Sequence, residues 1–255
     1  MCELMGVSAS VPTDIRALLR EFYAHSVRHP HGWGLFRIQD GTPEWYRAPE
    51  RAKDSTLLPS LIEETAPQTA ALAHIRLATV GAIKPENCHP YHGADASGRV
   101  WTLIHNGTIY SSRRLTPYHG IQTGDTDSER VFLYLLDCLG TAIREAQRPL
   151  TAEERFAVVE RFVISLAARN KLNLLIWDGE LLYVHKNMEG TLCMLERDGA
   201  RIVSTTPLSA ERWEPVPTAQ LMAYRDGTEA FVGICHGRVF VPNLAYITAA
   251  AALGI

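Results

Sequence analysis

The second residue of the chain, Cys2, could act as both a nucleophile and a base. Aminopeptidases remove an initiator methionine when the next side chain is small, so we expect Met1 to be cleaved and Cys2 to carry a free α-amine. The reference pKa is about 7.7–8.0 for an α-amine and about 8.5 for a thiol, so both groups titrate near neutral pH. A nucleophile activated by its own N-terminal amine is an established catalytic arrangement. The alternative is an ordinary cysteine, and other residues must decide between the two.

Two charged residues have types that could hold an amino-acid substrate. Arg76 lies in the apolar run Ala73–Thr79, where a guanidinium is costly to bury unless it meets an anion. Its planar fork suits a carboxylate held by two parallel hydrogen bonds; an internal acidic partner or a solvated face is the alternative. Asp127, in the segment Thr126–Glu129, could bind an ammonium group. It also fits a helix start, where the helix dipole favours acidic residues.

The dipeptide Asn106-Gly107 follows an apolar strand candidate. Asn-Gly is the strongest short signal for a hairpin turn. It could also form an oxyanion hole, because the side-chain amide of Asn106 and the backbone N–H of Gly107 can point at one oxygen, and glycine admits a close substrate. The two interpretations are compatible.

Four histidines raise the question of a metal. Imidazole nitrogens are common metal ligands, but no HExxH or close carboxylate–histidine pattern accompanies them. The sequence therefore favours a loop that lines a site, and it predicts no metal and no cofactor. The histidines are His74, His89, His92 and His105.

Together these segments suit one substrate, a γ-glutamyl amide. Its α-carboxylate would meet Arg76 and its α-ammonium would meet Asp127. Its side-chain carbonyl would lie between Cys2 and the pair Asn106 and Gly107. Hydrolysis would then pass through a γ-glutamyl thioester on the cysteine.

The same segments resemble the class-II glutamine amidotransferases, a branch of the N-terminal-nucleophile hydrolases, and they occur in that family's order over about the first half of the chain. The resemblance implies a four-layer αββα sandwich, with two antiparallel sheets between helical layers, and amide hydrolysis at Cys2. It also places Thr79, His89 and His105 beside the substrate. The matching segments are Cys2, Gly32–Gly34, His74–Thr79, Asn87–Pro90, His105–Gly107 and Thr126–Glu129.

The departures from the family pattern concern the substrate. Leu77 and Val80 stand where multidomain synthases usually have Trp and His, in a loop that covers glutamine. Pro30–Gly34 is similar to the Asp-Gly-Trp-Gly of a standalone subgroup, with His31 in place of Asp. That subgroup includes proteins that cleave γ-glutamyl bonds in glutathione breakdown and ergothioneine assembly. The substrate is therefore glutamine or a γ-glutamyl conjugate. An ammonia-supplying subunit of a separate synthase chain and a non-catalytic binding protein remain as alternatives.

The pattern of elements indicates an α+β fold. Strands come first, a helical pair follows, and hairpins complete the chain, which argues against parallel βαβ units. Capping boxes at Thr126–Glu129 and Thr151–Glu154 predict two helix starts. The last hairpin is predicted at Glu229–Ile234 and Arg238–Val241, joined by His236-Gly237. One domain, residues 1–255, is the economical organisation.

Composition excludes several partners. The formal net charge is −3, without the basic excess of nucleic-acid-binding proteins. No apolar run reaches the ~20 residues of a membrane span, and the segment 244–255 is predicted to be a packed tail.

The five cysteines contain no CxxC pair and no signal peptide is evident, which favours the cytoplasm. We expect a small-molecule substrate, and we leave open a synthase partner chain and a homodimer.

Overall fold

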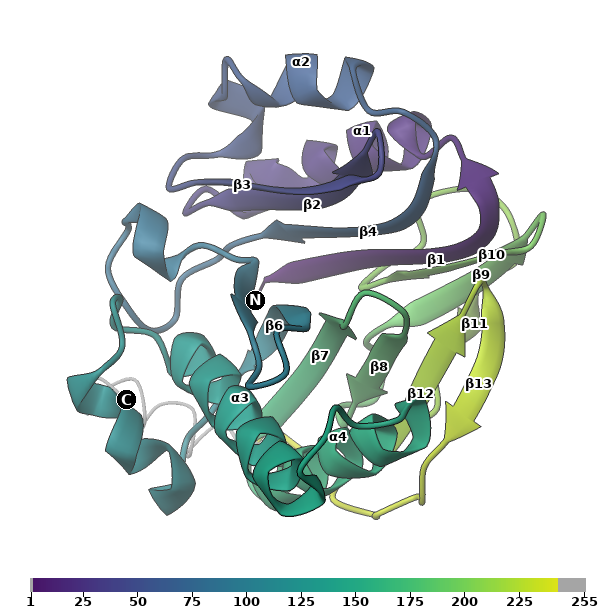
Figure 1. Ribbon diagram of the computed structural model, residues 1–255. Coiled ribbons are helices and arrows are strands. Elements are labelled where there is room, and N and C mark those ends of the chain that lie inside the picture. Colours follow the sequence, from purple (N-terminus) through teal and green to yellow (C-terminus); the bar gives the residue numbers. More distant parts are fainter. Residues whose placement is uncertain (1, 243–255) are drawn as a thin grey trace.

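The computed structural model describes residues 2–242 and consists of two antiparallel sheets packed face to face between helices (Figure 1). The seven-stranded sheet has the order β11-β9-β10-β1-β4-β2-β3, and the six-stranded sheet has the order β13-β12-β8-β7-β6-β5. The strands are β1 (Glu3–Thr13), β2 (Trp33–Gln39), β3 (Thr42–Ala48), β4 (Gln68–Ile75), β5 (Tyr91–Ala94), β6 (Val100–Thr108), β7 (Lys171–Trp177), β8 (Leu182–Lys186), β9 (Cys193–Arg197), β10 (Ala200–Ser204), β11 (Glu214–Pro215), β12 (Gln220–Arg225) and β13 (Thr228–Val232).

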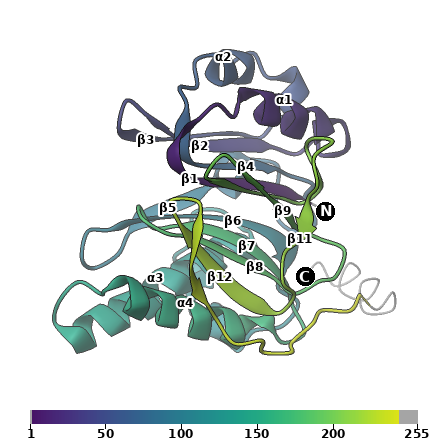
Figure 2. The same ribbon diagram turned by 90° about the vertical axis from the view of Figure 1, so that its right-hand side faces the viewer.

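Helices cover the outer face of each sheet, as the two views show (Figures 1 and 2). The short helices α1 (Arg16–Ala24) and α2 (Leu58–Glu63) pack on the seven-stranded sheet, and the longer α3 (Asp127–Ala146) and α4 (Ala152–Ala167) pack on the six-stranded sheet. The predicted four-layer αββα sandwich is thus confirmed. Short 3₁₀ turns occur at His25–Arg28, Ala52–Asp54, Pro85–Asn87 and Arg113–Gly120.

Three apolar clusters fill the spaces between the four layers. Alternate residues of a strand point to opposite faces, so Leu103 of β6 packs under the helices while Ile104 packs between the sheets. Both faces of β6 and β7 are buried, which explains why Leu172–Trp177 is apolar except at Asn173. The sheet-to-sheet layer ends where polar side chains replace apolar ones, at Asn106 and Lys171.

Both predicted helix starts are present. At α4 the capping box is complete: Thr151 accepts from the backbone of Glu154, and the Glu154 carboxylate accepts from Thr151 N–H. At α3 only the first half forms. Thr126 accepts from Glu129 N–H, but the Glu129 carboxylate accepts from the backbone N–H groups of Thr123 and Gly124 instead.

Two local predictions are wrong. Asn106-Gly107 is not a turn, because both residues pair with β7 inside β6. The last hairpin is formed by β12 and β13 around Asp226-Gly227, and Arg238–Val241 is not a strand. The Asp-Gly dipeptide, a hairpin signal in its own right, was the feature that could have located β12.

Other expectations are not decided by the fold. The segment 244–255, predicted to be a packed tail, lies outside the described residues. Within residues 2–242, no helix combines the length and apolarity that a bilayer span needs. The single domain over 1–255, the cytoplasmic location and the homodimer stay predictions.

Candidate functional site

Cys2 lies at the start of the central strand of the seven-stranded sheet. β1 runs between β4 and β10, with Glu3 opposite Ile75 and Met5 opposite Ser204. Two residues after Cys2, Leu4 packs in the layer between the sheets, so the alternation of β1 places Cys2 at the end of that layer. The thiol donates a hydrogen bond to the Leu77 carbonyl over 3.6 Å. Burial raises the pKa of the Cys2 thiol, and the positive charges of Arg76 and Lys171 oppose that rise.

Arg76 follows β4 and is almost fully buried. Its guanidinium donates to the carbonyl oxygens of Val80, Gly81 and Ala82 at 2.9–3.0 Å. Within residues 2–242 no carboxylate forms an ion pair with it, so the predicted alternative of an internal acidic partner does not occur there. A buried cation that meets only neutral carbonyls retains its attraction for an anion.

The loop that follows Arg76 is fastened to the start of α3. The Asn87 side chain donates to the Ala82 carbonyl (2.8 Å) and to Asp125, and it accepts from Asp125 N–H (2.9 Å). Asp125 also accepts from Ala82 N–H at 3.1 Å. Asn87 is fully buried. Asn87 belongs to a sequence motif to which no role was assigned, and in the structure it joins the two segments that carry Arg76 and Asp127.

Asp127 is the first residue of α3, as its alternative interpretation as a helix start predicts. One carboxylate oxygen accepts from Ile109 N–H at 2.7 Å and the other accepts from Ser128 N–H at 3.0 Å. The carboxylate therefore fixes the chain where it leaves β6, directly after Asn106 and Gly107. Its charge also acts on His105.

Asn106 and Gly107 lie at the end of β6, against the start of β7. The Lys171 ammonium donates to Asn106 Oδ1 at 2.8 Å, and both side chains are buried. Gly107 is required by close approach, since a Cβ there would lie 2.0 Å from the Lys171 carbonyl oxygen. Lys171 was not predicted from the sequence. Its signal there is a lysine at the start of a strand that is apolar except at Asn173.

The three remaining residues predicted beside the substrate have different surroundings. His89 is buried and packs on His74, with ring centroids 4.1 Å apart. His105 points to the helix side of β6, where its Nδ1 lies 2.9 Å from Ser128 Oγ. Thr79 is exposed, with its hydroxyl 3.4 Å from that of Thr108. The structure therefore does not bring His105 to the same face as Asn106.

The histidines do not form a metal site in the described part of the chain, where no group of three or more His, Cys, Asp or Glu side chains could hold an ion. Burial lowers the pKa of His74 to about 3 and that of His89 well below its usual value. Both rings are therefore neutral. Their nitrogens have no hydrogen-bond partner within residues 2–242.

The Gly32-Trp33-Gly34 segment supports the histidine-containing loop. A Cβ at Gly34 would lie 1.7 Å from the His89 carbonyl oxygen, so only glycine permits this contact. The neighbouring His31, which differs from the subgroup pattern, accepts a hydrogen bond from Ala78 N–H at 2.9 Å. His31 thus supports the chain just after Leu77, whose carbonyl contacts the Cys2 thiol.

Buried neutral histidines predict a loss of stability in mild acid. Burial lowers the pKa of His74 and of His185 in β8 to about 3. The unfolded chain titrates near 6.5, so it binds protons first as the pH falls, and unfolding free energy is lost from about pH 6.5 down to about pH 3. We expect a decline between about pH 7 and 5, above most carboxylate titrations, of at most about 1.4 kcal/mol per pH unit for each histidine.

Urea denaturation at a series of pH values measures this decline. His185→Gln should give a shallower slope than the wild type even if it lowers the stability at neutral pH. An unfolding free energy that does not change over this pH window would contradict the prediction.

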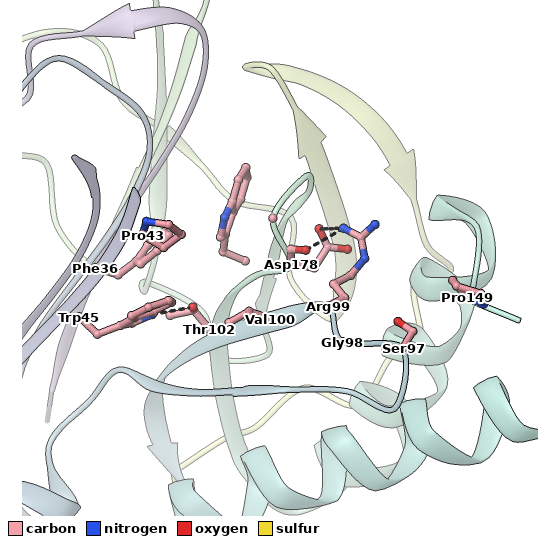
Figure 3. Close-up of a pocket in the computed structure, with 12 residues that line it drawn as sticks. Phe36, Pro43, Trp45, Ser97, Gly98, Arg99, Val100, Thr102, Pro149 and Asp178 are labelled. Carbon is pink, nitrogen blue, oxygen red and sulfur yellow. Dashed lines mark hydrogen bonds and ion pairs between the residues drawn. The ribbon is translucent and has the colours of Figure 1, made fainter. Parts of the chain in front are cut away.

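A separate cavity of about 440 Å³ opens at the other end of the sandwich (Figure 3). Phe36, Trp45 and Arg99 line it, and Trp45 donates to the Thr102 hydroxyl at 3.0 Å. It lies at the start of β6, whereas Asn106 lies near the end of that strand. No cysteine lines this cavity, so it is not the site of the proposed nucleophile.

At the end of the inter-sheet layer opposite this cavity, Cys2 precedes β1, Arg76 follows β4 and Asn106 lies on β6. A family model described as class-II glutamine amidotransferases matches residues 1–200. The chain belongs to this family. The match extends beyond the first half of the chain, where the sequence motifs occur, and includes β7 with Lys171.

Relatives of the chain are glutamine amidotransferases by name or are uncharacterised. "Putative glutamine amidotransferase YafJ" from Escherichia coli K12 is 27% identical over 247 residues, which cover 85% of this chain and 94% of that one. The "Uncharacterized protein MJ1515" of Methanocaldococcus jannaschii is 26% identical, over 89% of this chain and 70% of its own length.

Solved structures share the fold at lower identity. A protein described as a predicted glutamine amidotransferase from Pseudomonas aeruginosa PA01 has a TM-score of 0.62 and 22% identity, over 89% of this chain and 99% of that one. Glutamine phosphoribosylpyrophosphate amidotransferase from B. subtilis has a TM-score of 0.65 and 15% identity, over 90% of this chain and 48% of that one. This chain spans about half the length of the latter protein.

Proposed function

We propose that the protein hydrolyses the amide bond of a γ-glutamyl compound through Cys2. The observation that supports this proposal most directly is the arrangement of positive charges around the Cys2 thiol. Arg76 and Lys171 both act on the thiol, and Lys171 is bonded to Asn106. Membership of the class-II glutamine amidotransferases supports the same chemistry.

In this mechanism the α-amine of Cys2, exposed by removal of Met1, takes the thiol proton. The thiolate attacks the γ-carbonyl, and the Asn106 amide and the Gly107 backbone N–H stabilise the oxyanion. One such donor is worth about 2.7–4 kcal/mol. The protonated amine then gives its proton to the leaving nitrogen, and water hydrolyses the γ-glutamyl thioester to glutamate and free Cys2. The chain's own residues supply every group that these steps use.

The loop that follows Arg76, together with the start of α3, would hold the glutamyl end of the substrate. Arg76 would bind the α-carboxylate, and its carbonyl partners Val80, Gly81 and Ala82 fix the direction of its guanidinium. Asp127 would bind the α-ammonium. Leu77 and Val80 replace the aromatic and imidazole side chains of the multidomain synthases, so γ-glutamyl conjugates are included in the substrate class with glutamine.

A panel of γ-glutamyl compounds tests the proposal. Glutamine, glutathione, γ-glutamyl peptides and γ-glutamyl amines are incubated with the wild type and with Cys2→Ala, and released glutamate is measured. The intact mass of the wild type establishes whether Met1 is removed. Release from at least one compound by the wild type alone is expected, and equal release by both proteins would reject the mechanism.

The same panel, together with co-purification and binding measurements, separates a hydrolase from an ammonia-supplying subunit and from a non-catalytic binding protein. An ammonia-supplying subunit would co-purify with a synthase chain and support glutamine-dependent amination, whereas ammonia release without an acceptor favours a hydrolase. A non-catalytic binding protein would bind a γ-glutamyl compound without releasing glutamate.

Substitution of the two proposed anchors should act mainly on substrate binding. Arg76→Ala and Asp127→Asn are expected to raise KM by about tenfold or more with a smaller change in kcat, since each removes a contact present in both the ground state and the transition state. Steady-state kinetics with the best compound of the panel measure this. Wild-type KM and kcat in both variants would eliminate the assignment of the pocket.

A further inference from the structure

The residue that holds Asn106 is itself unusual. Lys171 opens β7 opposite Thr108 and is only 2% exposed, and Asn106 is equally buried. Buried lysines are rare unless they are paired. Here the ammonium donates to Asn106 Oδ1 over 2.8 Å.

The lysine determines which way the amide faces. An ammonium group has only donors, so the atom of Asn106 that meets Lys171 must be the carbonyl oxygen. The two N–H donors of Asn106 then point away from Lys171. Without this contact the amide could turn and present an acceptor to the substrate, which would repel a developing oxyanion.

The surroundings of Lys171 contain several charged or titratable groups. From the seven-stranded sheet, Cys2, just before β1, acts on Lys171, and Arg76, after β4, acts on Cys2. His105, on β6, contacts the Lys171 carbonyl (3.3 Å), and Asp127 of α3 acts on His105. Burial lowers the pKa of Lys171 to about 8, although Cys2 favours its charged form.

We propose that Lys171 is the positioning residue of the oxyanion hole, fixing the Asn106 amide with its donors toward the substrate and polarising it with positive charge. This inference rests on the proposed function of Asn106. Lys171 need not touch the substrate, and it acts through Asn106.

The pH dependence of kcat/KM tests whether the positive charge of Lys171 contributes to catalysis. The Cys2 α-amine also titrates near pH 8 and gains activity as base when it deprotonates, so the effect of Lys171 is measured as the ratio of the wild-type kcat/KM to that of Lys171→Met. With the best γ-glutamyl compound, this ratio should fall as the pH rises through about 8, because Lys171 deprotonates. Below that pH, the kcat/KM of Lys171→Met should be about tenfold or more lower than that of the wild type, which is a fraction of the effect of losing an oxyanion donor. At higher pH the two kcat/KM values should become equal. Lys171→Arg keeps its charge at any accessible pH, so it should retain more activity than Lys171→Met and show no loss near pH 8.

A double-mutant cycle tests whether Lys171 acts through Asn106. Lys171→Met should add little to the loss caused by Asn106→Ala, since the second substitution removes the group on which the first one acts. Full additivity would contradict the proposal. Lys186→Met is the matched control, because Lys186 is also buried but its charge faces Glu189 and Cys193; it should leave the pH profile unchanged.

The outcomes separate the two proposals. If Cys2→Ala is inactive but Lys171→Met keeps the wild-type kcat and pH profile, the positioning role is wrong and the proposed function stands. If Cys2→Ala is fully active, both fail. Should Lys171→Met not fold, as thermal melting would show, a constant ratio of wild-type to Lys171→Arg kcat/KM across pH 8 is enough to overturn the inference.

Discussion

Cys2→Ala is expected to release no glutamate above the uncatalysed rate from any γ-glutamyl compound that the wild type cleaves. The variant lacks the sulfur that would form the thioester, and no other cysteine can replace it. Cys88 is buried, with its thiol 3.4 Å from the Ala48 carbonyl, and burial raises its pKa to about 11. Loss of a catalytic nucleophile lowers kcat by about 10⁴–10⁶, the largest effect expected for any single substitution in this chain.

Two measurements show whether such a loss comes from chemistry. Cys2→Ala should melt at the temperature of the wild type, because the Cys2 side chain makes one weak hydrogen bond, to Leu77. Rapid quenching of the wild type with substrate should give a protein heavier by one glutamyl group, and the variant should show no such species. A labelled peptide that did not contain Cys2 would refute the assignment of the nucleophile.

Asn106→Ala is expected to lower kcat by about 10²–10³ with little change in KM, because an oxyanion donor acts mainly in the transition state. Alanine also leaves the buried Lys171 without its amide partner, so the variant should be less stable than the wild type. A lower kcat alone would therefore not separate chemistry from structure.

Asn106→Asp separates them. Aspartate keeps the shape of asparagine and can accept from the Lys171 ammonium, but it has no N–H donor when ionised. We expect Asn106→Asp to fold with near-wild-type stability and still to lose at least as much kcat as Asn106→Ala. Urea denaturation and steady-state kinetics on the same preparations give both quantities. Substantial activity in Asn106→Asp would mean that the side-chain amide is not an oxyanion donor.

Local patterns in the sequence predicted the α+β class and the two helix starts, and the family resemblance implied the four layers. The capping box at Thr151 marks α4 correctly, since both of its hydrogen bonds are local. The Asn106-Gly107 turn was wrong because pairing with β7, more than sixty residues later, overrides a local turn preference. β12 was missed because a short strand buried by long-range pairing carries no period of its own.

The candidate site was predictable only in part for the same reason. Cys2, Arg76 and Asp127 could be proposed from the sequence because their charge or position is unusual in the chain. Lys171 could not be assigned, because its partner Asn106 belongs to another strand and the contact depends on sheet register. His105 was placed beside the substrate from its neighbours in the motif, although the alternation of β6 turns it toward Ser128.

The clasp that Asn87 forms with Ala82 and Asp125 has a consequence for selectivity. It joins the segment that carries Arg76 to the segment that carries Asp127, so this contact helps to set the distance between the two proposed anchors, together with the ends of β4 and β6. On the proposed function, the two anchors would bind the α-carboxylate and α-ammonium of the glutamyl group, and they would make no contact with the leaving amine. The protein would then be strict about the acyl half of its substrate and tolerant of the amine that leaves.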